Sequence, residues 1–155
     1  MAAFQMSKPR IGQPAPDFEL PDQNGAPVRL SQFRGRSAVV LFFYPKDDTT
    51  GCTKEACRFR DEFEGFQAAG AQILGISSDS RASHAQFVSK YSLPFTLLSD
   101  EGGRVRKLFG IRSTFGIIPG RVTYVVDRDG ILRHVFSSQF RPELHIQEAL
   151  RALAR

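Results

Sequence analysis

Cysteine is scarce in this sequence of 155 residues, which contains only Cys52 and Cys57. Small secreted proteins held together by disulfides carry several pairs, so that class is excluded. Long apolar runs are also absent, because no segment approaches the roughly 18 residues of a membrane helix. The first residues lack the apolar core of a secretory signal. We therefore expect neither a membrane protein nor a protein exported by such a signal.

The sequence also lacks blocks of like charge, although 21 Lys+Arg against 16 Asp+Glu leave a net charge of +5. The basic residues are dispersed among acidic ones, and no zinc-finger, RNP or basic-zipper pattern occurs, so nucleic-acid binding is not expected. A content of 41% hydrophobic and 11% aromatic residues is typical of a globular protein. The length predicts a single domain over residues 1–155, with residues 1–10 flexible.

An unbroken apolar run, Ala38–Tyr44, predicts a strand that is buried on both faces. A helix is expected from Gly51 to Ala68, because apolar residues recur there every three or four positions, at Ala56, Phe59, Phe63 and Phe66. A second buried strand at 71–77 would complete a strand-helix-strand unit.

The rest of the chain contains turn signals between short apolar segments. The expected elements are a hairpin of 18–20 with 28–30 around Asn24-Gly25, a helix capped by Ser80 with His84 facing the core, a strand at 95–98, a helical turn at 105–109, a loop at 116–120, a hairpin of 121–126 with 131–136 and a helix from Pro142. Together they predict an α/β fold with a central mixed β-sheet and helices on both faces.

The two cysteines lie in the segment that follows the first buried strand, where open α/β sheets bind their ligands. Thr49 or Thr50 is a suitable N-cap, so Cys52 is expected in the first helical turn. The unpaired N–H groups and the positive end of the helix dipole favour the thiolate form there. Cys52 is therefore a candidate nucleophile, and the alternative is a small buried side chain with an inert thiol.

Cys57 lies five residues after Cys52. In an intact helix this spacing means roughly 7.5 Å of rise and about 140° of rotation, whereas disulfide-bonded Cα atoms lie about 4.4 to 6.8 Å apart. A disulfide between them would require the first helical turns to unwind. The alternative is a partly exposed thiol without a role. The cysteines and the three histidines match no zinc pattern, and no Cys-His protease signature occurs, so neither kind of site is expected.

The segment from Pro45 to Cys57 contains the pattern Pro-x-x-x-Thr-x-x-Cys, met by Pro45, Thr49 and Cys52, followed by a second cysteine five residues later. In this it resembles the peroxiredoxins, and among them the bacterioferritin-comigratory-protein or PrxQ subfamily. The likeness extends over almost the whole chain, through segments 15–20, 30–35, 43–48, 98–103 and 119–124. It implies a thioredoxin-like fold, with a central mixed β-sheet flanked by helices and the family's N-terminal extension.

The resemblance also implies a role for each matching residue. Cys52 would be the peroxidatic nucleophile and Cys57 the resolving thiol. Thr49 would be a hydrogen-bond partner of the sulfur and the peroxide oxygen, and Arg121 would stabilise the thiolate and the leaving oxygen. Pro45 would shield the pocket from water. Glu55 would orient Arg121. From its local sequence alone, Arg121 would be interpreted as a solvated charge at a strand end. Position 50, often proline in this subfamily, is Thr50.

The implied activity is that of a thiol-dependent peroxidase without metal, haem or other cofactor. Hydrogen peroxide or an alkyl hydroperoxide would oxidise Cys52 to a sulfenic acid, Cys57 would condense with it to a disulfide, and thioredoxin would reduce that disulfide. A monomer is expected, located in the cytoplasm of a bacterium, or in a plastid if a transit peptide has been removed. The alternatives are a general thiol-disulfide oxidoreductase, although those enzymes favour Cys-x-x-Cys, and a basic binding module.

Overall fold

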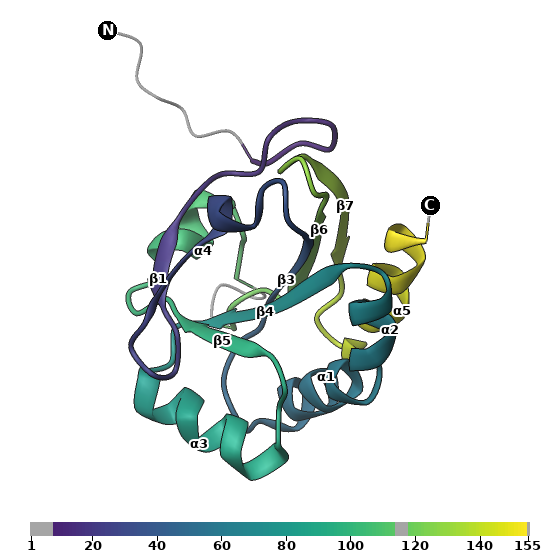
Figure 1. The fold of residues 1–155 in the computed structure, drawn as a ribbon. Coiled ribbons are helices and arrows are strands. Elements are labelled where there is room, and N and C mark those ends of the chain that lie inside the picture. The colour runs from purple at the N-terminus through teal and green to yellow at the C-terminus, as the bar shows by residue number, and fades with distance from the viewer. Residues whose placement is uncertain (1–7, 114–117, 155) are drawn as a thin grey trace, which may run out of the picture.

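The computed structural model describes residues 8–113 and 118–154. Its centre is a five-stranded mixed sheet in the order β5-β4-β3-β6-β7 (Figure 1). The strands are β3 (Ala38–Phe43), β4 (Ala71–Ser77), β5 (Thr96–Ser99), β6 (Val122–Val126) and β7 (Leu132–Ser137). β3, β4 and β5 run parallel, whereas β6 is antiparallel to β3 and β7 is antiparallel to β6. The predicted central strand is therefore confirmed, as is the mixed sheet.

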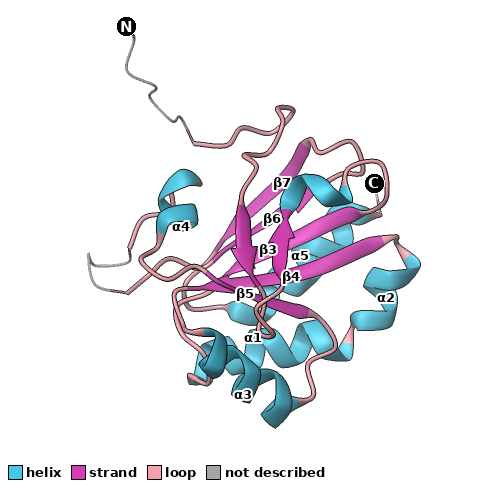
Figure 2. Cartoon of the chain, turned by 60° about the vertical axis from the view of Figure 1, so that its left-hand side comes forward, coloured by secondary structure: helices cyan, strands magenta, loops and turns pink. Residues whose placement is uncertain are grey.

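Helices cover both faces of the sheet, as expected (Figure 2). Helices α1 (Thr50–Asp61), α2 (Phe63–Ala68), α3 (Arg81–Tyr91) and α5 (Pro142–Leu153) contribute side chains to the core on one face. The other face is covered by α4 (Arg104–Leu108), by the 3-10 helix η1 (Leu30–Phe33) and by a separate hairpin of β1 (Glu19–Pro21) with β2 (Pro27–Arg29). No helix among the described residues is long and apolar enough to cross a membrane.

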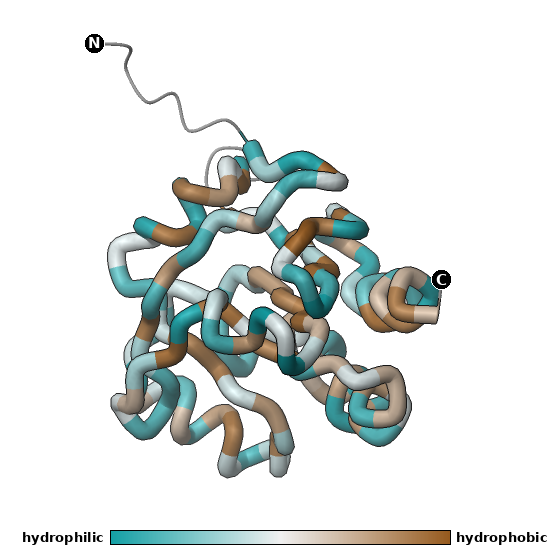
Figure 3. Tube along the Cα trace, turned by 45° about the horizontal axis from the view of Figure 1, so that its top comes forward, coloured by the Kyte–Doolittle hydropathy of each residue, from teal (hydrophilic) through white to brown (hydrophobic). Residues whose placement is uncertain are grey.

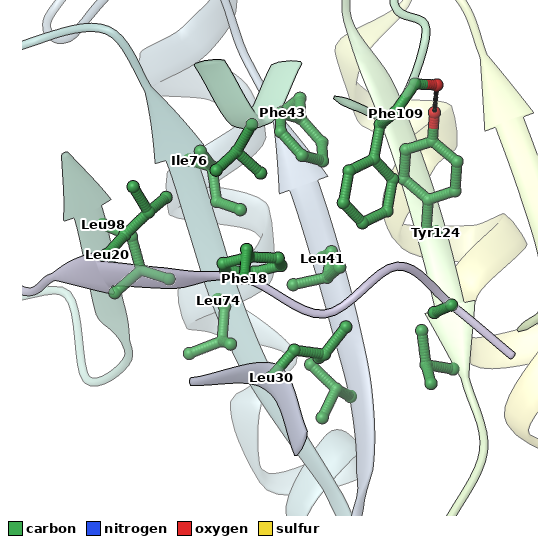
Figure 4. Close-up of a cluster of buried hydrophobic side chains, with 14 of the residues drawn as sticks. Phe18, Leu20, Leu30, Leu41, Phe43, Leu74, Ile76, Leu98, Phe109 and Tyr124 are labelled. Carbon is green, nitrogen blue, oxygen red and sulfur yellow. Dashed lines mark hydrogen bonds between the residues drawn. The ribbon is translucent and has the colours of Figure 1, made fainter. Parts of the chain in front are cut away.

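The side chains of β3 alternate between the two cores, as the pleat of a strand requires. Val40 and Phe42 enter the core beneath α1 and α5, whereas Leu41 and Phe43 enter the core beneath the N-terminal hairpin. Figure 4 shows the second cluster, in which Phe18, Leu20 and Leu30 lie over the strand residues. Figure 3 shows hydrophobic stretches on the strands and also on the helices that pack against them. Burial on both faces explains why the sequence of β3 shows no polar alternation.

The helix predicted at 51–68 is divided, because Glu62 leaves the helical conformation with φ −100° and ψ 11°. On either side of the break, Phe59 and Phe66 pack together in the shared core, with their ring centroids 5.5 Å apart. The strand predicted at 95–98 and the helix predicted at 105–109 each differ by one residue from β5 and α4. Residues 1–7 of the predicted flexible segment, and 116 and 117 of the predicted loop, lie outside the described residues.

Candidate active site

Cys52 lies in the first turn of α1, directly beyond the carboxyl end of β3, and its side chain is buried. The helix begins here because Thr49, in an extended conformation with φ −89° and ψ 159°, occupies the N-cap position. The Thr49 hydroxyl does not cap the helix as the sequence suggested, since it donates to the carbonyl oxygen of Lys46 at 2.9 Å. That bond uses the hydroxyl hydrogen and leaves the oxygen available as an acceptor.

Arg121 brings a buried guanidinium to the cysteine. Its Nη2 lies 3.4 Å from Sγ of Cys52, its Nη1 lies 2.6 Å from Oε1 of Glu55, and its Nε donates to the carbonyl oxygen of Gln139 at 3.2 Å. Burial lowers the pKa of Arg121, but the charges of Glu55 and Cys52 outweigh this effect and raise it. The interpretation of Arg121 as a solvated strand-end charge is therefore wrong, because only 4% of the residue is exposed.

Glu55 holds the other side of this guanidinium and is completely buried on the inner face of α1. Burial raises the pKa of Glu55 to about 8, although the Arg121 charge and hydrogen bond act in the opposite direction. Within the described part of the chain, its second oxygen, Oε2, accepts no hydrogen bond. The contact with Arg121 is the geometry that an orienting role requires.

Arg106 is a second buried arginine near the site, and no sequence pattern indicated it. Its Nη2 donates to the carbonyl oxygen of Tyr44 at 3.0 Å and its Nη1 to that of Gly120 at 2.7 Å. Burial lowers its pKa, while the charges of Asp100 and Cys52 oppose that effect. Arg106 therefore connects the end of β3 to the residue before Arg121. In the sequence it is one of several basic residues in a short helical turn, which explains why it was missed.

His145 is a buried residue of α5 that lies next to Glu55, and no sequence pattern indicated it. Its Nε2 lies 2.8 Å from the carbonyl oxygen of Ser138, and its Nδ1 lies 2.7 Å from the hydroxyl of Thr123 and 3.6 Å from Oε2 of Glu55. Burial, with a smaller effect of Arg121, lowers the pKa of His145 to about 4. At neutral pH the ring is therefore uncharged. Nε2 donates to the carbonyl, and Nδ1 accepts from the threonine.

This histidine makes the fold sensitive to acid. Its pKa in the folded protein lies below the ordinary value of about 6.5, so His145 favours the folded state above that pH. The contribution is lost as the pH falls through the folded pKa near 4. We expect the free energy of unfolding to drop by up to about 3 kcal/mol from this residue between pH 6.5 and 4. The replacement His145→Gln should reduce that drop, as measured by urea unfolding at both pH values.

The control is His134→Gln, which replaces a partly exposed histidine on β7 that pairs with Glu148. This variant should keep the acid sensitivity of the parent protein. An unchanged acid sensitivity in His145→Gln would show that His145 does not cause it.

Asp47, Asp79 and His84 are the described residues whose potential metal-ligand atoms gather within 4.8 Å of one another. Their atoms already take part in internal hydrogen bonds with Tyr44 and Ser83, among other groups. The sequence did not indicate this cluster, because its members come from different elements.

Comparison with known proteins identifies the family of this chain. Residues 11–135 match the AhpC/TSA family. Peroxiredoxin Q, chloroplastic, from Oryza sativa subsp. japonica is 54% identical over 143 residues, which are 92% of this chain and 65% of the relative. The protein of the same name from Sedum lineare is 55% identical over 92% of this chain and 76% of its own length. The chain thus spans about two thirds of the length of the rice protein.

Solved bacterial structures share the fold. Peroxidoxin BcpB from Mycobacterium tuberculosis superposes with a TM-score of 0.86 at 42% identity, covering 94% of this chain and 97% of the relative. The bacterioferritin comigratory protein of Xanthomonas campestris gives 0.81 at 28% identity, over 94% of this chain and all of its own. The thioredoxin-like peroxiredoxin fold is confirmed by these neighbours. With the match over residues 11–135, the identities above 50% show that this chain belongs to the AhpC/TSA family of peroxiredoxins, where it is similar to the peroxiredoxin Q proteins named here.

Proposed function

We propose that this protein is a thiol-dependent peroxidase that reduces hydrogen peroxide and alkyl hydroperoxides. The observation that carries the proposal is the buried guanidinium of Arg121, which lies 3.4 Å from Sγ of the buried Cys52 at the start of a helix. The bacterioferritin comigratory protein of Xanthomonas campestris is described as having alkyl peroxide reduction activity, which supports the same chemistry here.

In the first step the Cys52 thiolate attacks one oxygen of ROOH. The O–O bond breaks, ROH leaves after taking up a proton, and Cys52 becomes a sulfenic acid. Arg121 stabilises both the reactant and the transition state of this step. Its fixed N–H groups stabilise the thiolate and the negative charge that develops on the leaving oxygen. The free lone pairs of the Thr49 hydroxyl can accept a hydrogen bond from the peroxide, and the partly buried Pro45 of the same loop would shield the site from water.

In the second step Cys57 attacks the sulfur of the sulfenic acid and water leaves, which forms a disulfide. Both cysteines are free and both lie in the intact helix α1, where the spacing prevents a bond. Burial raises the pKa of Cys57, although Arg60 opposes the effect, so the folded helix favours its thiol form. Unwinding of α1 would therefore bring the sulfurs together and also make Cys57 a better nucleophile.

A dithiol protein such as thioredoxin would then reduce the disulfide by exchange. Because both cysteines belong to one helix, a single-domain monomer suffices for this cycle. The curated relatives named above are chloroplast proteins and the solved structures are bacterial, so the plastid alternative gains support and a bacterial cytoplasm stays a prediction. The alternative of a general thiol-disulfide oxidoreductase is less favoured, since the cysteines are not arranged as Cys-x-x-Cys.

The test is a thiol count and an intact mass of the reduced protein before and after one equivalent of hydrogen peroxide. Loss of two thiols and of about 2 Da is expected, because a disulfide releases two hydrogens. If both thiols survive brief stoichiometric treatment, the peroxidase proposal fails. An insulin-reduction assay then becomes the test of the oxidoreductase alternative.

A further inference from the structure

A buried polar cluster lies between helix α3 and the loop that carries Pro45 and Thr49. Asp47, in this loop, accepts a hydrogen bond from the Tyr44 hydroxyl at 2.6 Å and one from the Ser83 hydroxyl at 2.8 Å. Its Oδ2 also lies 2.7 Å from Nδ1 of His84. His84 is completely buried and Asp47 is 8% exposed.

Both ring nitrogens of His84 have hydrogen-bond partners. Nε2 lies 2.9 Å from the carbonyl oxygen of Leu98, which can only accept, so Nε2 donates. Nδ1 lies 2.7 Å from Oδ2 of Asp47. Removal of either partner would leave a buried polar group without its partner, which is strongly unfavourable.

The same loop is attached at two more points. The backbone N–H of Asp47 donates to Oδ2 of Asp79 at 2.8 Å. The carboxylate of Asp48 accepts from Nζ of Lys90 at 2.7 Å and from the hydroxyl of Tyr91 at 2.6 Å, both on α3. Asp48 has a φ of 59°, in the left-handed region that residues other than glycine adopt infrequently, although aspartate does so more often than most. Such a conformation persists only where surrounding contacts maintain it.

We propose that Asp47 and His84 are positioning residues that hold the loop 45–49 against α3, so that Thr49, the N-cap residue of α1, keeps its place relative to Cys52 in the first turn for the reaction with peroxide. This inference rests on the proposed peroxidase function. The attachments end at Asp48, whereas α1 begins at Thr50 and packs against α5. Helix α1 can therefore unwind for disulfide formation while the loop remains fixed to α3.

The inference separates the two chemical steps. The peroxide step needs Thr49 and Cys52 in a fixed relative position, and a displacement of about 1 Å can lower the rate up to 100-fold. The disulfide step takes place after α1 unwinds, so it does not require Thr49 and Cys52 to keep that relative position. Loss of the Asp47 contacts should therefore slow the oxidation of Cys52 much more than the subsequent formation of the disulfide.

The experiment uses rapid mixing of the full-length reduced protein with hydrogen peroxide, quenching with a thiol-blocking reagent and intact-mass analysis. It gives the second-order rate constant for Cys52 oxidation and the first-order rate constant for disulfide formation. We expect Asp47→Ala to lower the first constant about tenfold and to change the second by less than about threefold. Asp47→Asn should restore the first constant, because its amide group can donate to Nδ1 of His84 while its oxygen still accepts from Tyr44.

The matched control is Ser80→Ala, which removes the N-cap bond to the backbone of Ser83 and weakens the same helix without touching Asp47. It should leave both rate constants near those of the parent protein. Equal oxidation rates in Asp47→Ala and the parent would overturn the inference, as would a tenfold loss in Ser80→Ala or a lack of rescue by Asp47→Asn. Failure of the parent protein to react with peroxide would instead overturn the proposed function.

Discussion

The replacement Cys57→Ser is expected to abolish sustained peroxide consumption while leaving the first oxidation of Cys52 intact. The serine hydroxyl cannot form a disulfide with the sulfenic acid. A dithiol reductant such as thioredoxin therefore has no disulfide to reduce by exchange. Cys57 lies on α1 away from the guanidinium of Arg121, which contacts Cys52 and Glu55 instead. Each molecule should therefore consume one equivalent of hydrogen peroxide and stop. Peroxide consumption with excess thioredoxin and its reductase measures this directly.

The companion variant is Cys52→Ser, which removes the nucleophile and should consume no peroxide at all above the background rate. Intact mass after one equivalent of peroxide distinguishes the two variants, since Cys57→Ser should gain about 16 Da at Cys52. Sustained turnover by Cys57→Ser would place resolution at another thiol, such as that of the reductant. Substantial turnover by Cys52→Ser would contradict the assignment of the nucleophile.

Arg121→Gln is expected to lower the second-order rate constant for Cys52 oxidation by about 100-fold or more. A fixed donor aimed at developing negative charge contributes about 100-fold to 1,000-fold in comparable sites, and the change also removes the cation 3.4 Å from the sulfur. Glutamine keeps a polar group but cannot contact Cys52, Glu55 and Gln139 together, as the guanidinium does. The rate of sulfenic acid formation, trapped by a dimedone-type reagent, measures the effect.

The Arg121→Gln variant also leaves Glu55 buried without its cation, so its folding needs a separate control. In the double variant Arg121→Gln with Glu55→Gln, no buried carboxyl group remains without its cation. The double variant should recover stability in urea unfolding but not the rate of oxidation. If it recovered the rate as well, Arg121 would act through the stability of the site and not through the charge near the sulfur.

Much of the fold could be predicted because the relevant patterns are local. The strand from Ala38 and the strand at 71–77 follow from unbroken apolar runs, and the N-cap of α3 at Ser80 follows from its hydroxyl, which accepts from Ser83 at 3.1 Å. The division between α1 and α2 was not predictable, because the apolar spacing does not mark Glu62 as a break. An apolar period of three and four fits a straight helix and a broken one equally well.

The site could be predicted only where one segment or the family resemblance carried it. Position and spacing make Cys52 and Cys57 candidates, and the resemblance proposes Arg121, whose local sequence indicates a solvated charge. Arg106, His145 and the pair of Asp47 with His84 are brought in by tertiary contacts. For His84 the pattern predicted burial correctly, but not the carboxyl partner, because that partner lies 37 positions away.

The intact helix around both cysteines also bears on the reduction potential of the proposed disulfide. In the dithiol state Ala56 and Phe59 of α1 are completely buried, and the oxidised state must give up part of this packing. Packing present only in the dithiol form makes the disulfide a stronger oxidant, by about 30 mV for each 1.4 kcal/mol. Such a disulfide passes its oxidising equivalents readily to a dithiol protein. The helix would then refold as the bond opens, and the same packing that delays resolution would drive regeneration of the enzyme.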